Sequence, residues 1–148
     1  MSRTNAMGST VVPGTACKPE VPDPDRPIMF AAAQIFICDG ERCHGCHKED
    51  PAERLRALIK EEGCHQGPER IKVTRTHCQG ACRFRGFASV YQNGRARHYN
   101  QVASFSAWKG VHTWSDEEWR ALLVALRAGR LPESLMSCRV AEQVYDGA

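Results

Sequence analysis

The run Ile71-Lys72-Val73-Thr74 is followed, after three residues, by Cys78-Gln79-Gly80-Ala81-Cys82. The first run alternates apolar and polar side chains, which predicts a short strand with Ile71 and Val73 on its buried face. The second run has two thiols with three residues between them and Gly80 in the middle, so a tight loop can offer both sulfurs to one metal centre. Together they predict a sheet that carries a cysteine site at the end of one strand.

A second group of cysteines lies upstream and also follows a predicted strand. Residues 31–37 end in the apolar run Ile35-Phe36-Ile37, which is typical of a buried strand. Cys38 comes directly after this strand, and the loop that follows holds Cys43 and Cys46. No pair of thiols in one short loop can supply four ligands, whereas the two groups together can.

A helix separates the two groups. Asp50 is a preferred N-cap residue, Pro51 suits the first turn, and Gly63 ends the predicted helix. A strand–helix–strand unit of this size forms a parallel pair through a right-handed crossover. Both predicted strands then end at the same edge of the sheet, which brings the two cysteine groups together.

The rest of the chain predicts two more strands and a second helix. Residues 87–91 read as the third strand, Asn93-Gly94 as a hairpin turn, and residues 95–99 as the fourth strand. Residues 100–113 are predicted to be irregular. Ser115-Asp116-Glu117-Glu118 is a capping box, with Trp114 and Trp119 placed as a hydrophobic staple, and Gly129 ends the helix. Its predicted core face carries Trp119, Leu122, Leu123 and Leu126.

The predicted order β-α-β-β-β-α indicates an α/β protein with a small mixed sheet, and it is the core order of a thioredoxin-like fold. Residues 1–30 are rich in proline and small polar residues, which predicts a disordered N-terminal tail. Residues 31–136 form the predicted domain, and residues 137–148 a C-terminal tail. Cys17 lies in the first tail, and Cys64 and Cys138 lie outside both cysteine loops.

The composition of the chain argues against several classes of protein. The chain has 148 residues, eight cysteines and a formal net charge of +3, which is too weak and scattered to indicate nucleic-acid binding. Its first 27 residues contain no apolar signal-peptide core, and no apolar run approaches the ~18 residues of a membrane span. We therefore expect a cytoplasmic protein without a membrane partner, in which clustered cysteines indicate metal or redox chemistry.

At this point the sequence resembles the thioredoxin-like 2Fe–2S ferredoxins and the related small cluster subunit of NADH dehydrogenase. The resemblance runs from Gln34 to Leu135 and rests on Ile35-Phe36-Ile37-Cys38, the Cys78–Cys82 loop, Val90-Tyr91 and the closing helix. It implies a ferredoxin with one 2Fe–2S cluster, two ligands from each loop, redox partner proteins and a homodimer. The chain lacks the family's Gly-Pro after Cys82, carries an apparent insertion at residues 100–113, and offers three cysteines in the first loop.

Other chemistries stay open. Cys43, Cys46, Cys78 and Cys82 could form a structural zinc site in an interaction module. Cys43-His44-Gly45-Cys46-His47 matches the attachment pattern of c-type haem, which would leave Cys38, Cys78 and Cys82 without a role. A dithiol oxidoreductase is a further alternative. We find no set of catalytic residues, so we expect an electron carrier and no enzyme.

The ligands predicted for the cluster are Cys38, Cys46, Cys78 and Cys82, with Cys43 as the alternative to Cys46. The spacing Cys38-x-x-x-x-Cys43 resembles that of the NADH dehydrogenase subunit and favours Cys43. The distance to the helix start at Asp50-Pro51 favours Cys46, because in the family that the chain resembles the second cysteine lies just ahead of the first helix. The N-terminus of that helix would also stabilise a nearby anionic cluster. Positive side chains near the cysteines, Arg42, Lys48, Arg83 and Arg85, are expected to favour the reduced cluster.

Overall fold

The structure is a computed structural model that describes residues 3–4, 10–11, 31–67, 69–92 and 105–140. Its main sheet has four strands in the order β4-β3-β5-β6. The strands are β3 (Ala33–Cys38), β4 (Ile71–Thr76), β5 (Ala88–Gln92) and β6 (Phe105–Trp108). β3 pairs parallel with β4 and antiparallel with β5, and β5 pairs antiparallel with β6. The mixed sheet and the parallel β3–β4 pair are as predicted.

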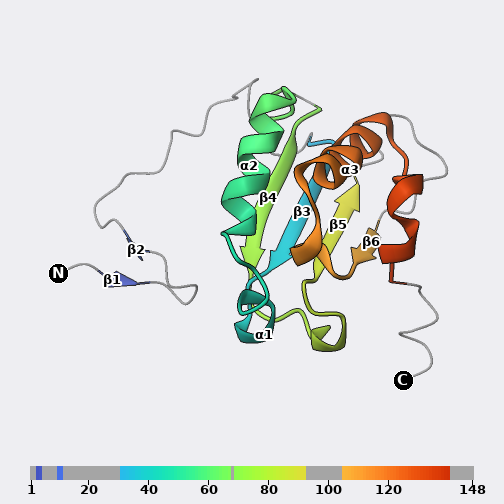
Figure 1. Cartoon of the computed structure of the whole chain (residues 1–148). Coiled ribbons are helices and arrows are strands. Elements are labelled where there is room, and N and C mark those ends of the chain that lie inside the picture. The colour runs from blue at the N-terminus through green and yellow to red at the C-terminus, as the bar shows by residue number, and fades with distance from the viewer. Residues whose placement is uncertain (1–2, 5–9, 12–30, 68, 93–104, 141–148) are drawn as a thin grey trace.

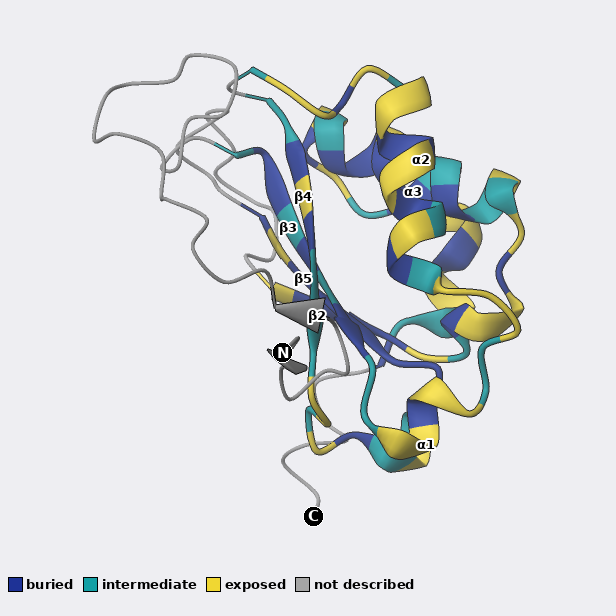
Figure 2. Cartoon of the chain, turned by 90° about the vertical axis from the view of Figure 1, so that its left-hand side faces the viewer, coloured by how far each residue is buried: buried dark blue, intermediate teal, exposed yellow. Residues whose placement is uncertain are grey.

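Two helices, α2 (Pro51–Glu61) and α3 (Asp116–Ala128), cover the same face of this sheet (Figures 1 and 2). A single turn, α1 (Glu41–His44), lies at the end of the sheet. Three short 3₁₀ segments complete the described part of the chain: η1 (Cys82–Phe84), η2 (Val111–Thr113) and η3 (Glu133–Cys138). No helix of the described residues is both long and apolar enough to cross a membrane.

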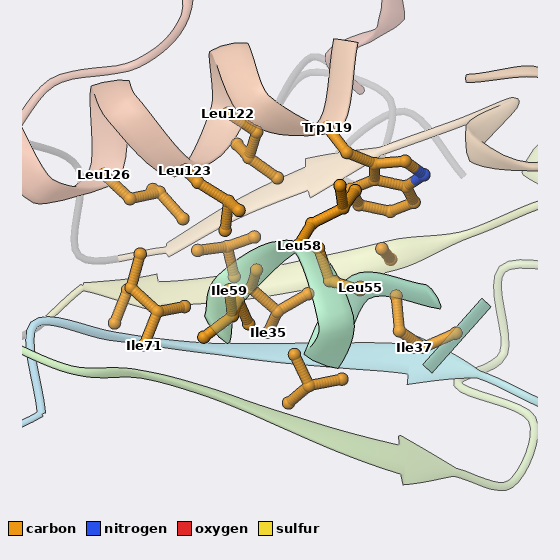
Figure 3. Close-up of a cluster of buried hydrophobic side chains, with 14 of the residues drawn as sticks. Ile35, Ile37, Leu55, Leu58, Ile59, Ile71, Trp119, Leu122, Leu123 and Leu126 are labelled. Carbon is orange, nitrogen blue, oxygen red and sulfur yellow. The ribbon is translucent and has the colours of Figure 1, made fainter. Parts of the chain in front are cut away.

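The core lies between the helices and the sheet (Figure 3). Alternation along β3 puts Ile35 and Ile37 on the covered face, where both are fully buried. The α2 stripe and the α3 stripe close over them, as helical spacing predicts. The buried members of these two stripes are Ala52, Leu55, Leu58, Ile59, Trp119, Leu122, Leu123 and Leu126.

Both predicted helix starts are confirmed. The Asp50 carboxylate accepts hydrogen bonds from the backbone N–H groups of Ala52 and Glu53, at 3.0 and 3.3 Å. Ser115 and Glu118 form the complete capping box that opens α3. The rings of Trp114 and Trp119 lie 4.7 Å apart, so the hydrophobic staple is also present.

The second half of the sheet differs from the prediction. Residues 100–113 were expected to be irregular, but they contain β6, which pairs with β5 from Ala88↔Trp108 to Tyr91↔Phe105. The predicted turn at Asn93-Gly94 and the predicted strand at 95–99 lie outside the described residues. Because Gln92 and Phe105 are 13 positions apart in the sequence, β5 and β6 are joined by a connection longer than the two-residue turn.

The segments on either side of the predicted domain also contain described structure. Arg3–Thr4 pairs antiparallel with Thr10–Val11 in a separate two-stranded sheet. At the other end, the backbone N–H of Val140 donates to the carbonyl of Ala107 at 2.8 Å, and Arg139 bridges to Trp108. The packed part of the chain therefore continues a few residues beyond residue 136. The division into a domain and two tails remains a prediction.

Candidate metal centre

The two cysteine segments meet at the C-terminal ends of β3 and β4. In Figure 1, α1 and the loop that follows β4 both lie at the lower end of the sheet, toward which both arrows point. The backbone N–H of Asp39 donates to the carbonyl of Thr76 at 2.9 Å, which ties the two segments together. The edge predicted from the parallel β3–β4 pair is therefore where the cysteines lie.

Gly40 is the point of closest approach between the segments. A Cβ atom on Gly40 would lie 2.9 Å from the backbone N and Cα of Cys78, which is closer than real Cβ contacts come. The backbone of Gly40 is ordinary extended chain, with φ −65° and ψ 162°, so the need for glycine is a matter of space alone. The sequence contained this glycine, but no local pattern showed that another segment would press against it.

The first segment contributes two buried thiols. Cys38 is 3% exposed and Cys43 is 2% exposed, and both pack with Ala81 and Phe87 in a small apolar cluster. Burial raises the pKa of the Cys38 thiol, hydrogen bonds from the backbone of Gly40 and Gln79 oppose this, and the neighbouring Cys43 thiol raises it further. Cys38 and Cys43 thus lie close enough for each thiol to affect the charge of the other.

The second segment contributes a more exposed pair. The sulfurs of Cys78 and Cys82 lie 3.2 Å apart. The loop turns at Gly80, whose positive φ of 80° suits glycine and directs its N–H toward the Cys78 sulfur at 3.3 Å. This N–H and the Cys82 thiol lower the pKa of Cys78, whereas the hydrogen bond with Cys78 raises the pKa of Cys82.

The two pairs also influence each other. The Arg42 guanidinium, on the first segment, contributes to lowering the pKa of Cys78. The pKa of Cys82 is raised, chiefly by the hydrogen bond with Cys78. Arg42 makes a smaller contribution that lowers it, and Cys43 a smaller contribution that raises it. Arg42 therefore lies close enough to the second pair to act on its charge, although sequence distance alone gives no sign of this.

Gln79 positions the second loop. Its side-chain amide donates to the carbonyl of Phe36 at 3.2 Å and to the Thr76 hydroxyl at 3.0 Å. Its side-chain oxygen accepts from the Ser89 hydroxyl at 2.7 Å. One side chain thus joins the loop to three strands of the sheet. No pattern in the sequence distinguishes this residue, because a glutamine in a short loop resembles an ordinary solvent-exposed side chain.

Cys46 is not a member of the apolar cluster that contains Cys38 and Cys43. Its half-buried thiol donates to the carbonyl of Arg42 at 3.4 Å, on the same segment. The segment that holds Cys43 and Cys46 was predicted to be a loop, but Glu41–His44 form the helical turn α1, in which Cys43 is buried. Cys64 is buried in the main core, Cys138 packs against its side, and Cys17 lies outside the described residues.

The histidines beside the cysteines make other contacts. The Nδ1 atom of His44 lies 2.7 Å from a carboxylate oxygen of Asp39. Burial, with the neighbouring His112, lowers the pKa of His47, and the two rings lie 6.3 Å apart. The side chain of His77 is exposed, while its backbone carbonyl accepts from the Cys38 thiol at 3.7 Å.

The arrangement of the donor side chains determines which kind of metal centre they could hold. Within the described residues, no three or more His, Cys, Asp or Glu side chains converge in a way that would hold one metal ion. The thiols meet instead as two pairs, Cys38 with Cys43 and Cys78 with Cys82. A dinuclear 2Fe–2S cluster takes four thiolates, two for each iron, so the donor set fits that group.

No protein-family model matches this chain, and no curated protein matches it. Its function is therefore inferred from its own residues.

Proposed function

We propose that this protein is an electron carrier that holds one 2Fe–2S cluster at the C-terminal ends of β3 and β4. The observation that carries the proposal is the meeting of two pairs of thiols from segments that α2 separates in the sequence. When bound, such a cluster supplies one-electron transfer without bond-making on a substrate. The order β3-α2-β4-β5-β6-α3 supports the finer proposal of a thioredoxin-like fold.

We propose Cys38, Cys43, Cys78 and Cys82 as the four ligands. This reverses the preference for Cys46 that the distance to α2 suggested. The reason is that α1 directs Cys43 into the small apolar cluster with Cys38, whereas the Cys46 thiol is engaged with a carbonyl of its own segment. The spacing of Cys38 and Cys43 agrees with the resemblance to the NADH dehydrogenase subunit.

The surroundings of the four thiols suit a negatively charged group. Backbone N–H groups of Gly40, Gln79 and Gly80 point at sulfur atoms, and such hydrogen bonds favour the thiolate form. Arg42 adds a positive charge beside Cys78 and Cys82. Because reduction adds one negative charge to a cluster, these groups would favour the reduced state.

The alternatives fit this geometry less well. A structural zinc ion needs four ligands around one point, whereas the thiols come together as two pairs. Covalent haem attachment through Cys43 and Cys46 needs both thiols to reach the same porphyrin. Cys43 is buried in the apolar cluster with Cys38, whereas Cys46 is half-buried and its thiol is engaged with the carbonyl of Arg42, so their surroundings differ.

The proposed partners are other redox proteins and a second copy of this chain. The sheet face away from the helices carries a row of aromatic rings, with Phe36 and Tyr91 5.6 Å apart and Tyr91 and Phe105 5.0 Å apart. Tyr91 is 51% exposed and Phe105 is 36% exposed. This apolar surface supports the homodimer that the family resemblance implies.

The test is the metal content of the protein purified without oxygen. We expect a brown protein with equal amounts of iron and acid-labile sulfide and an absorption spectrum that bleaches on reduction. A colourless protein that contains zinc, or a protein with a haem spectrum, would overturn the proposal.

A further inference from the structure

A second site lies away from the thiols, between α2 and the start of β4. A cavity of about 400 Å³ opens there. Its volume falls within the range of small-molecule pockets, which is roughly 300–1,000 Å³. The residues that line it are Arg56, Ile59, Lys60, His65, Arg70, Ile71, Lys72 and Val73. None of them belongs to the cysteine segments, so the cavity is separate from the proposed cluster.

The charge of this cavity has one sign. Four of its lining residues, Arg56, Lys60, Arg70 and Lys72, carry a positive charge at neutral pH, and none is acidic. No ion pair to these four is found among the described residues. Two acidic residues of the surrounding chain are engaged elsewhere, since Glu61 pairs with Arg120 at 3.1 Å and Glu69 pairs with Arg127 at 3.6 Å. The side chains that line the cavity therefore give it a net positive charge.

The fold explains why these cations gather. Arg56 and Lys60 are four residues apart on α2 and therefore share one face of the helix. β4 ends the sheet order, and the guanidinium of Arg56 donates to the carbonyl of Val73 at 3.3 Å, which holds Arg56 against this edge. The Nε atom of Arg70 is buried and has no hydrogen-bond partner among the described residues. A buried donor of this kind calls for an acceptor.

The floor of the cavity is apolar. Ile59, Ile71 and Val73 line it and are 3, 3 and 6% exposed. A guanidinium matches a phosphate group through paired hydrogen bonds, and a lysine adds a point charge. The cavity thus combines phosphate-binding groups with an apolar surface, which a free inorganic ion would leave unused.

We propose that this cavity binds an organic di- or triphosphate. Its phosphates lie among Arg56, Lys60, Arg70 and Lys72, and its organic part lies on Ile59, Ile71 and Val73. The proposal does not depend on the cluster, because the two sites share no residue.

Calorimetric titration of the purified 148-residue chain with ADP tests this proposal, with pyrophosphate and adenosine as partial ligands. We expect ADP to bind more tightly than pyrophosphate, and adenosine not to bind measurably. Lys60→Gln combined with Lys72→Gln removes two exposed charges from the cavity and should weaken ADP binding by about tenfold or more. Lys109→Gln is the matched control, because Lys109 is an exposed lysine that follows β6 and does not line the cavity. It should leave the affinity unchanged.

Four results would overturn the proposal. The first is no ADP binding at millimolar concentration to wild-type protein whose circular dichroism spectrum shows it to be folded. The second is an equal loss of affinity in the Lys109→Gln control, which would mean unspecific charge attraction. The third is pyrophosphate binding as tightly as ADP, since the apolar floor would then contribute nothing. The fourth is an RNA oligonucleotide that binds and is not displaced by ADP.

Discussion

The two cysteine segments reach the same end of the sheet but are held there in different ways. In the first, Cys38 and Cys43 are part of an apolar cluster and are almost fully buried. In the second, Cys78 is exposed and Cys82 is half-buried, and the loop is held by polar contacts of Gln79 and Gly80. The first pair therefore contributes to folding, whereas the second pair contributes chiefly to binding the cluster. The difference predicts that cysteine substitutions in the two segments have different consequences for stability.

The largest effect is expected in the exposed pair. Cys78→Ser or Cys82→Ser should prevent assembly of a stable native cluster, because each removes one of four ligands and no other thiol adjoins that loop. The fold should persist, and the cluster-free variant and the cluster-free wild type should unfold at nearly the same urea concentration, as expected for exposed positions. Iron and sulfide analysis and urea unfolding measure the two effects. A variant that keeps the wild-type spectrum and iron content would contradict the ligand assignment.

In the buried segment, Cys43→Ser should remove the cluster and also destabilise the protein by about 1–3 kcal/mol, since a hydroxyl replaces a thiol in apolar surroundings. Cys46→Ser is the matched control and should keep both the cluster and most of the stability. The same iron analysis and urea unfolding compare the two variants. The reverse pattern, with the cluster lost only in Cys46→Ser, would restore Cys46 as the fourth ligand.

The contact between the segments can be broken without removing a thiol. Gly40→Ala places a methyl group against the backbone of Cys78 and should separate the two pairs, which lowers the iron bound per chain to well below half. Gly45→Ala is the control, because a Cβ on Gly45 would lie 3.6 Å from its nearest neighbour, an ordinary contact. Equal iron contents in the two variants would show that the close approach at Gly40 is not needed for the cluster.

Much of the scaffold was predictable because its signals are local. Asp50-Pro51 and the capping box from Ser115 to Glu118 satisfy backbone groups within one turn, and both helices begin where these signals lie. The parallel β3–β4 pair follows from a strand–helix–strand order, so the meeting of the two cysteine segments was also within reach of the sequence.

What escaped prediction depends on contacts between distant segments. β6 pairs with β5 across residues 93–104, whereas Asn93-Gly94 favoured a tight turn. The four residues of α1 have no strong helix signal, and the turn is accompanied by burial of Cys43 beside Ala81 and Phe87. For this reason we propose Cys43 as the fourth ligand, where the distance to α2 had favoured Cys46. Gly40 and Gln79 act through contacts with other strands and segments, and a local sequence pattern does not show such contacts.

A smaller effect is expected at Asp50, which lies between the two segments. Its carboxylate caps α2 and pairs with Arg75, near the end of β4. Asp50→Ala should reduce the free energy of unfolding by about 1 kcal/mol at neutral pH, the usual value of an N-cap. Asp50→Asn is the control, since it retains the cap and loses the charge. Urea unfolding of the three proteins measures the difference, and equal stability of Asp50→Ala and wild type would contradict the cap's contribution.

The difference in the free energy of unfolding between wild type and Asp50→Asn should depend on pH. Partial burial alone would raise the pKa of Asp50, but the hydrogen bond from Arg75 and those from the backbone of Glu53 and Ala52 hold it below its ordinary value. A lowered pKa means that the charge stabilises the fold above the ordinary value of about 3.9, and that this stability is lost as the pH falls through the lower, folded-state value. The advantage of wild type over Asp50→Asn should therefore shrink below about pH 4. An advantage that grows with acidity would contradict the assignment.

The smallest expected effect is that of a charged side chain of one segment on the thiols of the other. Arg42 belongs to the buried segment and acts on both thiols of the exposed one. Because a reduced cluster is more negative, Arg42→Gln should lower the reduction potential. Arg42 is exposed, and water and salt screen its charge, so the shift should be on the order of tens of millivolts. Arg83→Gln combined with Arg85→Gln should also lower the potential, but less for each charge removed, because both side chains are exposed and neither is among the charges that act on Cys78 or Cys82.

Lys109→Gln serves again as the control, and protein-film voltammetry compares all four proteins. If Arg42→Gln and Lys109→Gln have the same reduction potential, Arg42 does not tune the potential. The first segment would then contribute ligands to the centre but no charge that affects it.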